Sequence, residues 1–207
     1  NLQTKITEED WVLFFYRGIS HEQSKDWAAA EADFRQSLTL NPDQPQVLNY
    51  LGYGLVDRGE SLDEALGMIE KAVAADPEQG YIIDSLAWAY FKLGRYADAL
   101  KPMEKASLLE PVDPIVTDHL GDVYWMNDRK PEARFQWRRA LSFKPTETDE
   151  KRILRKPVIG VVLATDDQAG VRIAAVTPGS ADAGAGLKSG DRITSVDGKR
   201  VEAGSAD

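Results

Sequence analysis

Residues 80–113 read GYIIDSLAWAYFKLGRYADALKPMEKASLLEPVD, and their pattern indicates the fold of the chain. Small, large and proline positions alternate in it in a fixed phase, at Ala87, Ala99, Met103, Ala106 and Pro111. Small residues let two helices approach to about 8–10 Å, and a proline disfavours the continuation of a helix because it lacks an N–H. The stretch therefore predicts a helical hairpin whose second helix ends at the proline.

The same pattern occurs four times along the chain. The terminal prolines are spaced by 35, 34 and 34 residues, at Pro42, Pro77, Pro111 and Pro145. A large apolar residue precedes each proline at a constant distance, at Phe34, Ile69, Met103 and Trp137. A small residue recurs in each first helix, at Gly18, Gly52, Ala87 and Gly121. Such a period predicts a solenoid of stacked hairpins.

The residues Ser85-Leu86-Ala87-Trp88-Ala89-Tyr90, then Gly94-Arg95-Tyr96, Ala99, Ala106 and Pro111, resemble the consensus of the tetratricopeptide repeat. That resemblance implies a mainly α fold of helix–turn–helix units. We predict a solenoid domain over residues 1–156. Its repeats are expected at 11–44, 45–79, 80–113 and 114–147, and residues 148–156 are expected to form a polar helix that caps the last one.

The amino-acid composition changes after Lys156, and residues 157–207 are rich in Gly, Ala, Val and Asp. Alternation predicts strands at 158–163, 171–176 and 192–196, with a short helix ending at Leu187. This is a small β-rich module, separate from the solenoid.

The motifs Pro178-Gly179-Ser180, Ala185-Gly186-Leu187 and Gly190-Asp191-Arg192-Ile193 make this module resemble a PDZ domain of the bacterial HtrA-protease type. The resemblance implies that a C-terminal peptide adds as a strand along the segment Val158, Ile159, Gly160, Val161 and Val162. The chain stops at Asp207, before the helix that forms the far wall of such a groove. The module is therefore expected to be partial, whether truncated, disordered, completed by a second copy or fused.

In tetratricopeptide proteins the first helices line a concave groove that binds peptides. The corresponding positions here are aromatic and polar: Asn49, Tyr50, Tyr53, Tyr81, Asp84, Trp88, Asp118, Asp122 and Trp125. Aromatic faces beside carboxylates suit a segment that carries basic or aromatic side chains. About half of the aromatic residues would alternatively be packing residues between repeats.

Several kinds of site are not expected. The family members that clamp a carboxylate do so with Lys and Arg, where this chain has Asn49, Asp84 and Asp118. The absence of cysteine and the presence of only two histidines leave little for a metal centre or a catalytic set. We predict no cofactor, no metal and no enzymatic activity.

Charge is unevenly distributed. Residues 1–128 contain 23 acidic and 10 basic side chains, whereas residues 129–156 contain 4 acidic and 10 basic ones. The overall charge of −9 argues against a nucleic-acid partner. The basic segment is either a solvated helical end that complements its acidic neighbours or a contact patch for an anionic partner or membrane surface.

Together these features predict a scaffold or adaptor that holds partner proteins by peptide segments, with only indirect membrane contact. The resemblances favour the bacterial periplasm or cell envelope, with the cytoplasm as the alternative. Two other functions stay open. One is a regulatory fragment of a larger envelope protease or peptidase, and the other is a structural protein that self-assembles through the incomplete module.

Overall fold

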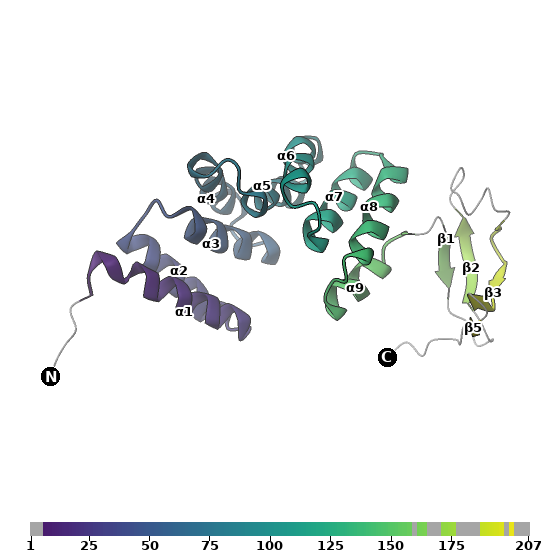
Figure 1. Ribbon diagram of the computed structural model, residues 1–207, viewed down its shortest axis with the longest axis horizontal. Coiled ribbons are helices and arrows are strands. Elements are labelled where there is room, and N and C mark those ends of the chain that lie inside the picture. The colour runs from purple at the N-terminus through teal and green to yellow at the C-terminus, as the bar shows by residue number, and fades with distance from the viewer. Residues whose placement is uncertain (1–5, 159–160, 165–170, 177–186, 197–198, 201–207) are drawn as a thin grey trace.

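The computed structural model describes residues 6–158, 161–164, 171–176, 187–196 and 199–200, and all structural statements below concern these residues. A short 3₁₀ helix at Glu8–Asp10 leads into helical hairpins that stack in chain order, with the strands at the C-terminal end (Figure 1). The hairpins are α1 (Trp11–Gln23) with α2 (Trp27–Leu40), α3 (Pro45–Arg58) with α4 (Leu62–Ala75), α5 (Gly80–Lys92) with α6 (Tyr96–Leu109), and α7 (Pro114–Met126) with α8 (Lys130–Ser142). The predicted α-solenoid is confirmed.

In each hairpin, a small residue of the first helix packs against a large residue of the second helix. A Cβ atom added to Gly121 would lie 2.4 Å from Cδ1 of Trp137, and one added to Gly18 would lie 2.6 Å from Cε1 of Phe34. Trp137 and Phe34 are buried, so the ring occupies the space that the glycine leaves. The alternation of small and large residues in the sequence is thus the packing contact of each hairpin.

Prolines and caps set where the helices begin and end. Pro45 and Pro114 stand in the first turns of α3 and α7, where a missing N–H costs nothing. Asp113 precedes α7, and its carboxylate accepts hydrogen bonds from the N–H groups of Ile115 (2.7 Å) and Val116 (3.0 Å). Gly59 ends α3 in the left-handed region, with φ of 72°, which glycine adopts without strain.

A ninth helix, α9 (Glu147–Leu154), packs on the last hairpin. Ile153 is fully buried and joins the hydrophobic cluster that contains Trp137 and Met103. Val158 belongs to the same cluster, and the Nε of Arg134 donates to the carbonyl of Pro157 over 3.2 Å. The chain is therefore anchored to the solenoid as far as Val158.

Short antiparallel strands follow. β1 (Val161–Ala164) pairs with β2 (Val171–Val176), and β2 pairs with β3 (Arg192–Ile193), in the order β1-β2-β3. β4 (Ser195–Val196) pairs with β5 (Lys199–Arg200) in a second small sheet. The strand predicted at 192–196 is thus two strands, because the residues on either side of Thr194 pair with different partners. The short helix expected before Leu187 lies outside the described residues.

Candidate peptide-binding pocket

A pocket of about 390 Å³ opens on the face formed by the first helices of the hairpins. We call it the tyrosine pocket, and it is lined by Glu22, Asn49, Tyr50, Tyr53, Tyr81, Asp84, Ser85, Asp113, Ile115 and Val116. These residues come from α1, α3, α5, the cap of α7 and α7 itself, and from no second helix of a hairpin. The first helices thus form one continuous inner surface.

Three tyrosines shape the pocket. Tyr50 and Tyr53 are three residues apart on α3 and share a helix face, and Tyr81 lies on α5 opposite them. Tyr50 and Tyr81 are each 37% exposed, so their rings stay accessible to a ligand. Burial, together with the nearby Asp84 carboxylate, raises the pKa of Tyr53, which keeps its hydroxyl protonated.

Asn49 is buried at the same site, with 5% of its surface exposed. Its Oδ1 accepts no hydrogen bond from the described residues. A buried acceptor without a partner is costly. Asn49 therefore has one buried acceptor at the pocket, Oδ1, that lacks a donor among the described residues.

Asp84 lies beneath the pocket and is paired within the protein. Nδ1 of His119 lies 3.0 Å and 3.1 Å from the two carboxylate oxygens of Asp84. The imidazole stacks on Trp88 with 3.9 Å between ring centroids. Burial lowers the pKa of His119, but the Asp84 carboxylate more than offsets this, so the pKa lies above its usual value and the imidazolium is favoured.

Asp118 and Asp122 form a second buried charged cluster with α9 and the residues after it. Asp118 is fully buried and accepts from Nη1 of Arg152 and Nζ of Lys156, each at 2.6 Å. Lys156 also donates to Asp122 over 2.7 Å, and Nε1 of Trp137 donates to Asp122 over 3.0 Å. The basic residues around 152–156 therefore neutralise acids of the fourth hairpin.

The sequence-predicted groove residues divide into two groups. The structure brings together around the tyrosine pocket Asn49, Tyr50, Tyr53, Tyr81 and Asp84. It places outside that pocket Trp88, Asp118, Asp122 and Trp125. A peptide-binding role for the first group stays a prediction.

The expectation that the second group lines an open groove is corrected by its contacts. Trp88 is covered by His119, and Asp118 and Asp122 are covered by Lys156. Trp125 packs against Trp137, with 5.3 Å between ring centroids, and under the ammonium group of Lys130. Each of these four side chains is in contact with another part of the chain.

The residues predicted to bind a C-terminal peptide are only partly described. Val158 is buried in the solenoid core, and Val161 and Val162 lie in β1 opposite Val176 and Ala175. Ile159 and Gly160 lie outside the described residues. The role of the segment stays a prediction, except that the buried Val158 side chain faces the solenoid.

Several lining residues were missed from the sequence, namely Glu22, Asp113, Ile115 and Val116. Glu22 lies in the last turn of α1, and the other three lie where α7 begins. Position within a repeat could not identify them, because they border the pocket from neighbouring hairpins. The His119–Asp84 and Arg152–Asp118 pairs were also missed, although their separations of 35 and 34 residues match one repeat period and offered a signal.

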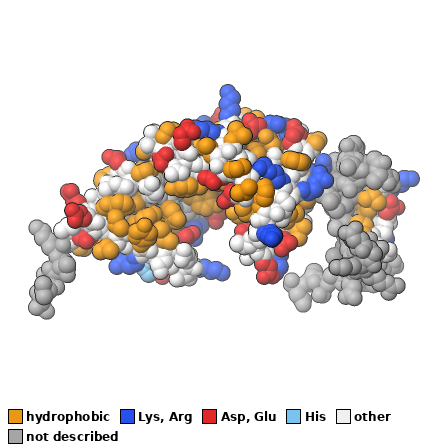
Figure 2. Space-filling model, viewed as in Figure 1, with side chains coloured by type: hydrophobic (Ala, Val, Ile, Leu, Met, Phe, Trp, Pro, Cys, Tyr) orange, Lys and Arg blue, Asp and Glu red, His pale blue; other side chains and the backbone are white. Residues whose placement is uncertain are grey.

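No helix among the described residues has the length and apolar character that a membrane span requires. The same part of the chain contains no group of three or more His, Asp or Glu side chains arranged to hold a metal ion. The face shown in Figure 2 carries Lys and Arg side chains concentrated toward the α7–α9 end and a broad hydrophobic surface over the first hairpins.

Comparison with known proteins agrees with this geometry. The tetratricopeptide repeat model matches residues 2–147, and the PDZ domain model matches residues 148–207. The domain boundary after residue 156 stays a prediction. Among curated proteins, the TPR repeat-containing protein PA4667 of Pseudomonas aeruginosa is 36% identical over 114 residues. That match covers 55% of this chain and 19% of the relative, so the chain spans about a fifth of that protein.

Solved structures show the same fold. One is MamA, residues 41 to the end, from Desulfovibrio magneticus RS-1, with a TM-score of 0.57, 22% identity, and coverage of 67% of this chain and 77% of that one. Another, described as the crystal structure of MamA, has a TM-score of 0.53, 21% identity, and coverage of 66% and 80%. Tetratricopeptide repeats and PDZ domains are protein-interaction modules. Because the first family model matches well over half of its length, this chain belongs to the tetratricopeptide repeat family, and its repeats are followed by a PDZ domain.

Proposed function

We propose that this chain is a non-enzymatic scaffold that holds partner proteins by extended peptide segments, and that the tyrosine pocket is its main contact site. The observation that carries the proposal is the convergence of Tyr50, Tyr53 and Tyr81 around one open pocket on the inner helices. Exposed aromatic rings beside polar groups are typical of surfaces that bind peptides. Both families of domain in the chain typically act in binding rather than catalysis.

Peptides selected from a displayed random library against the full chain test this function. We expect calorimetry to give a measurable affinity for selected peptides. Replacing both exposed rings, in Tyr50→Ala with Tyr81→Ala, should weaken it by at least about tenfold, since buried aromatic contacts dominate such interfaces. The control is Leu108→Ala, which removes an 81% exposed apolar side chain elsewhere. Equal affinity of the double variant and the wild type would contradict the proposal.

A second contact is proposed for the PDZ domain. β1 is an edge strand of the three-stranded sheet, so its outer edge can accept another strand. A C-terminal peptide pairing along β1 would gain main-chain hydrogen bonds. We expect a peptide with a free carboxylate to shift the backbone amide resonances of Val161 and Val162 more than the same peptide with an amidated end. Equal shifts would speak against carboxylate recognition.

We also propose that the chain works in the bacterial periplasm or envelope. The support is the resemblance of its repeats and its PDZ motifs to those of envelope proteins. Fractionation of cells that express the natural protein, with marker proteins for each compartment, tests the proposal. Recovery in the cytoplasmic fraction would contradict it.

A further inference from the structure

We propose that the tyrosine pocket selects a Lys or Arg side chain of the bound segment. The inference rests on the proposed peptide-binding function and adds to it the chemical identity of the side chain that enters the pocket. It is carried by the charge of the lining, by the unpartnered Oδ1 of Asn49, and by the way this chain binds its own cations on the same surface.

The lining is acidic and contains no Lys, Arg or His. Its three carboxylates belong to Glu22, Asp84 and Asp113. Of these, Asp84 is paired with His119, whereas Glu22 and Asp113 form no ion pair within the part of the chain that the structure describes. One oxygen of Asp113 caps α7, which leaves the other oxygen for a ligand. A cationic group would therefore meet two carboxylates that no cation among the described residues neutralises.

The tyrosine rings add a second attraction for a cation. A guanidinium or ammonium group over an aromatic face is stabilised by the ring quadrupole. The described residues make this contact on a tyrosine ring twice outside the pocket. The guanidinium of Arg95 lies 4.5 Å from the ring centroid of Tyr90, and that of Arg129 lies 4.0 Å from the ring centroid of Tyr124. Each of these arginines also pairs with a carboxylate, as Arg129 does with Glu104 at 2.8 Å.

Equivalent positions of successive hairpins indicate which chemical groups pair with the first helices. The same position of the second, third and fourth hairpins is occupied by Asn49, Asp84 and Asp118. Asp84 holds His119, and Asp118 holds Arg152 and Lys156. Asn49 lacks such a donor within the described residues. A basic side chain of a ligand would supply at Asn49 the kind of donor that the protein supplies at the next two positions.

Other side chains fit less well. An acidic or phosphorylated residue would be repelled by the unneutralised carboxylates. A purely aliphatic side chain would leave Oδ1 of Asn49 without a donor and would cover part of Asp113 without offering a hydrogen bond, and that costs free energy. A pocket of about 390 Å³ is at the small end of the range of roughly 300–1,000 Å³ found for ligand sites, which suits one long side chain.

The test uses one extended peptide scaffold, chosen as a binder in the library experiment and capped at both ends. Its pocket residue is varied between Arg, Lys, Gln, norleucine and Glu. Affinity for the full chain is measured by calorimetry at low and moderate salt. We expect Arg and Lys to bind at least about tenfold more tightly than norleucine or Gln. The advantage should shrink as salt rises, because the pocket is open to solvent.

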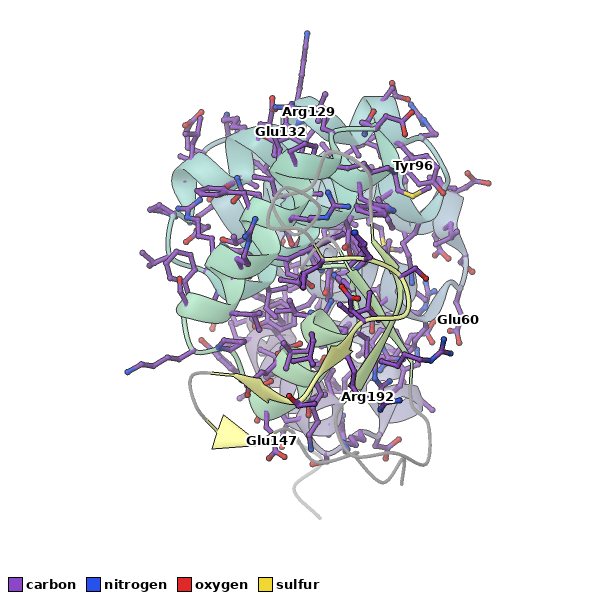
Figure 3. All side chains as sticks on the ribbon, turned by 90° about the vertical axis from the view of Figure 1, so that its right-hand side faces the viewer. Glu60, Tyr96, Arg129, Glu132, Glu147 and Arg192 are labelled. Atoms are coloured by element: carbon purple, nitrogen blue, oxygen red, sulfur yellow. The ribbon has the colours of Figure 1, made fainter. Side chains whose placement is uncertain are left out.

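Charge removal in the protein gives the matched comparison. Glu22→Gln combined with Asp113→Asn removes two carboxylates while keeping side-chain size, and Asn caps a helix as well as Asp. This variant should lose most of the preference for Arg over norleucine. The control pair is Glu60→Gln with Asp43→Asn, which removes the same charge from exposed turns outside the pocket and should keep the preference; Glu60 is labelled in Figure 3.

The outcomes separate the two proposals. Norleucine or Glu peptides that bind as tightly as the Arg peptide, with binding still lost in the tyrosine double variant, would overturn the cation preference and leave peptide binding in place. An Arg preference that survives Glu22→Gln with Asp113→Asn would also overturn it. Failure of every peptide to bind would overturn both proposals.

Discussion

Among single residues, the small size of the glycines and alanines inside the hairpins is required by the large side chains that face them. Gly121 leaves no room for a side chain, since a Cβ atom would lie 2.4 Å from both Cδ1 and Nε1 of Trp137. Gly67 is also within a helix, yet an added Cβ would meet nothing within 4 Å. Two glycines with the same helical backbone therefore have opposite reasons for being tolerated.

We predict that Gly121→Ala lowers the free energy of unfolding by about 1–3 kcal/mol, the usual cost of overpacking a core. Gly67→Ala should raise it by up to about 1 kcal/mol, because alanine is the better helix former. Urea denaturation followed by circular dichroism measures both. Similar behaviour of the two variants would show that the Gly121–Trp137 contact is not as close as described.

A second residue-scale prediction concerns His119. Its pKa is raised in the folded protein, against an unfolded value of about 6.5. The stabilising contribution of the imidazolium is therefore complete below that pH and is lost as the pH rises through the folded-state pKa. The carboxylates that act on the ring include Asp84, Asp118, Asp122 and Asp149, and Arg152 and Lys156 pair with the acids of α7.

We expect the wild type to lose more stability than His119→Gln as the pH rises from about 6.5 through the folded-state pKa. Urea denaturation at a series of pH values measures this. His21→Gln is the control, because it leaves the buried pair in place, and it should keep the wild-type dependence. If the glutamine variant fails to fold, the imidazole titration of the wild type by NMR decides, and a pKa at or below 6.5 would refute the claim.

Among the helices, α9 and the residues just after it supply the cations that neutralise the buried acids of the fourth hairpin. Lys156 contacts two carboxylates and is mostly shielded from solvent, with 16% of its side chain exposed. Lys151, which lies on α9 itself, pairs with Glu147 at 2.6 Å, but its side chain is 68% exposed. Replacing Lys156 should therefore cost more stability than replacing Lys151.

We predict that Lys156→Met destabilises the protein by about 3–5 kcal/mol, because it leaves Asp118 and Asp122 short of a cation in a buried site. Lys151→Met should change stability by less than about 0.5 kcal/mol, the usual value of an exposed pair on a helix. Thermal and urea denaturation of both variants provide the comparison. A small effect of Lys156→Met would mean that water, rather than the lysine, compensates these carboxylates.

The hairpins and the cap could be predicted from sequence, whereas the partners of the charged residues could not. The small, large and proline positions indicate directly which helix faces meet, so the four hairpins are predicted from the sequence and are observed. Asp118 looks the same in sequence as an exposed groove acid. Its burial depends on where α9 crosses the surface, which the periodic pattern does not encode.

At the scale of the whole molecule, each hairpin relies on its neighbours. In a solenoid, stability is close to a sum of unit and interface terms, and the last unit needs a cap. Here the cap supplies both the buried Ile153 and the cations for Asp118 and Asp122. The solenoid therefore ends in physical terms near Val158.

We predict that a fragment of residues 1–147 is markedly less stable than one of residues 1–158, since only the longer one retains the cap and the Lys156 contacts. Differential scanning calorimetry and light scattering compare them, and the shorter fragment should also self-associate through the surface it exposes. Equal melting temperatures would show that α9 is dispensable.

Val158 packs in the core that contains Trp137, and the first strand of the PDZ domain begins at Val161. The last side chain held by the repeats is thus only a few residues from the sheet. We expect a polar substitution at Val158 to disturb both the repeat core and the start of the sheet.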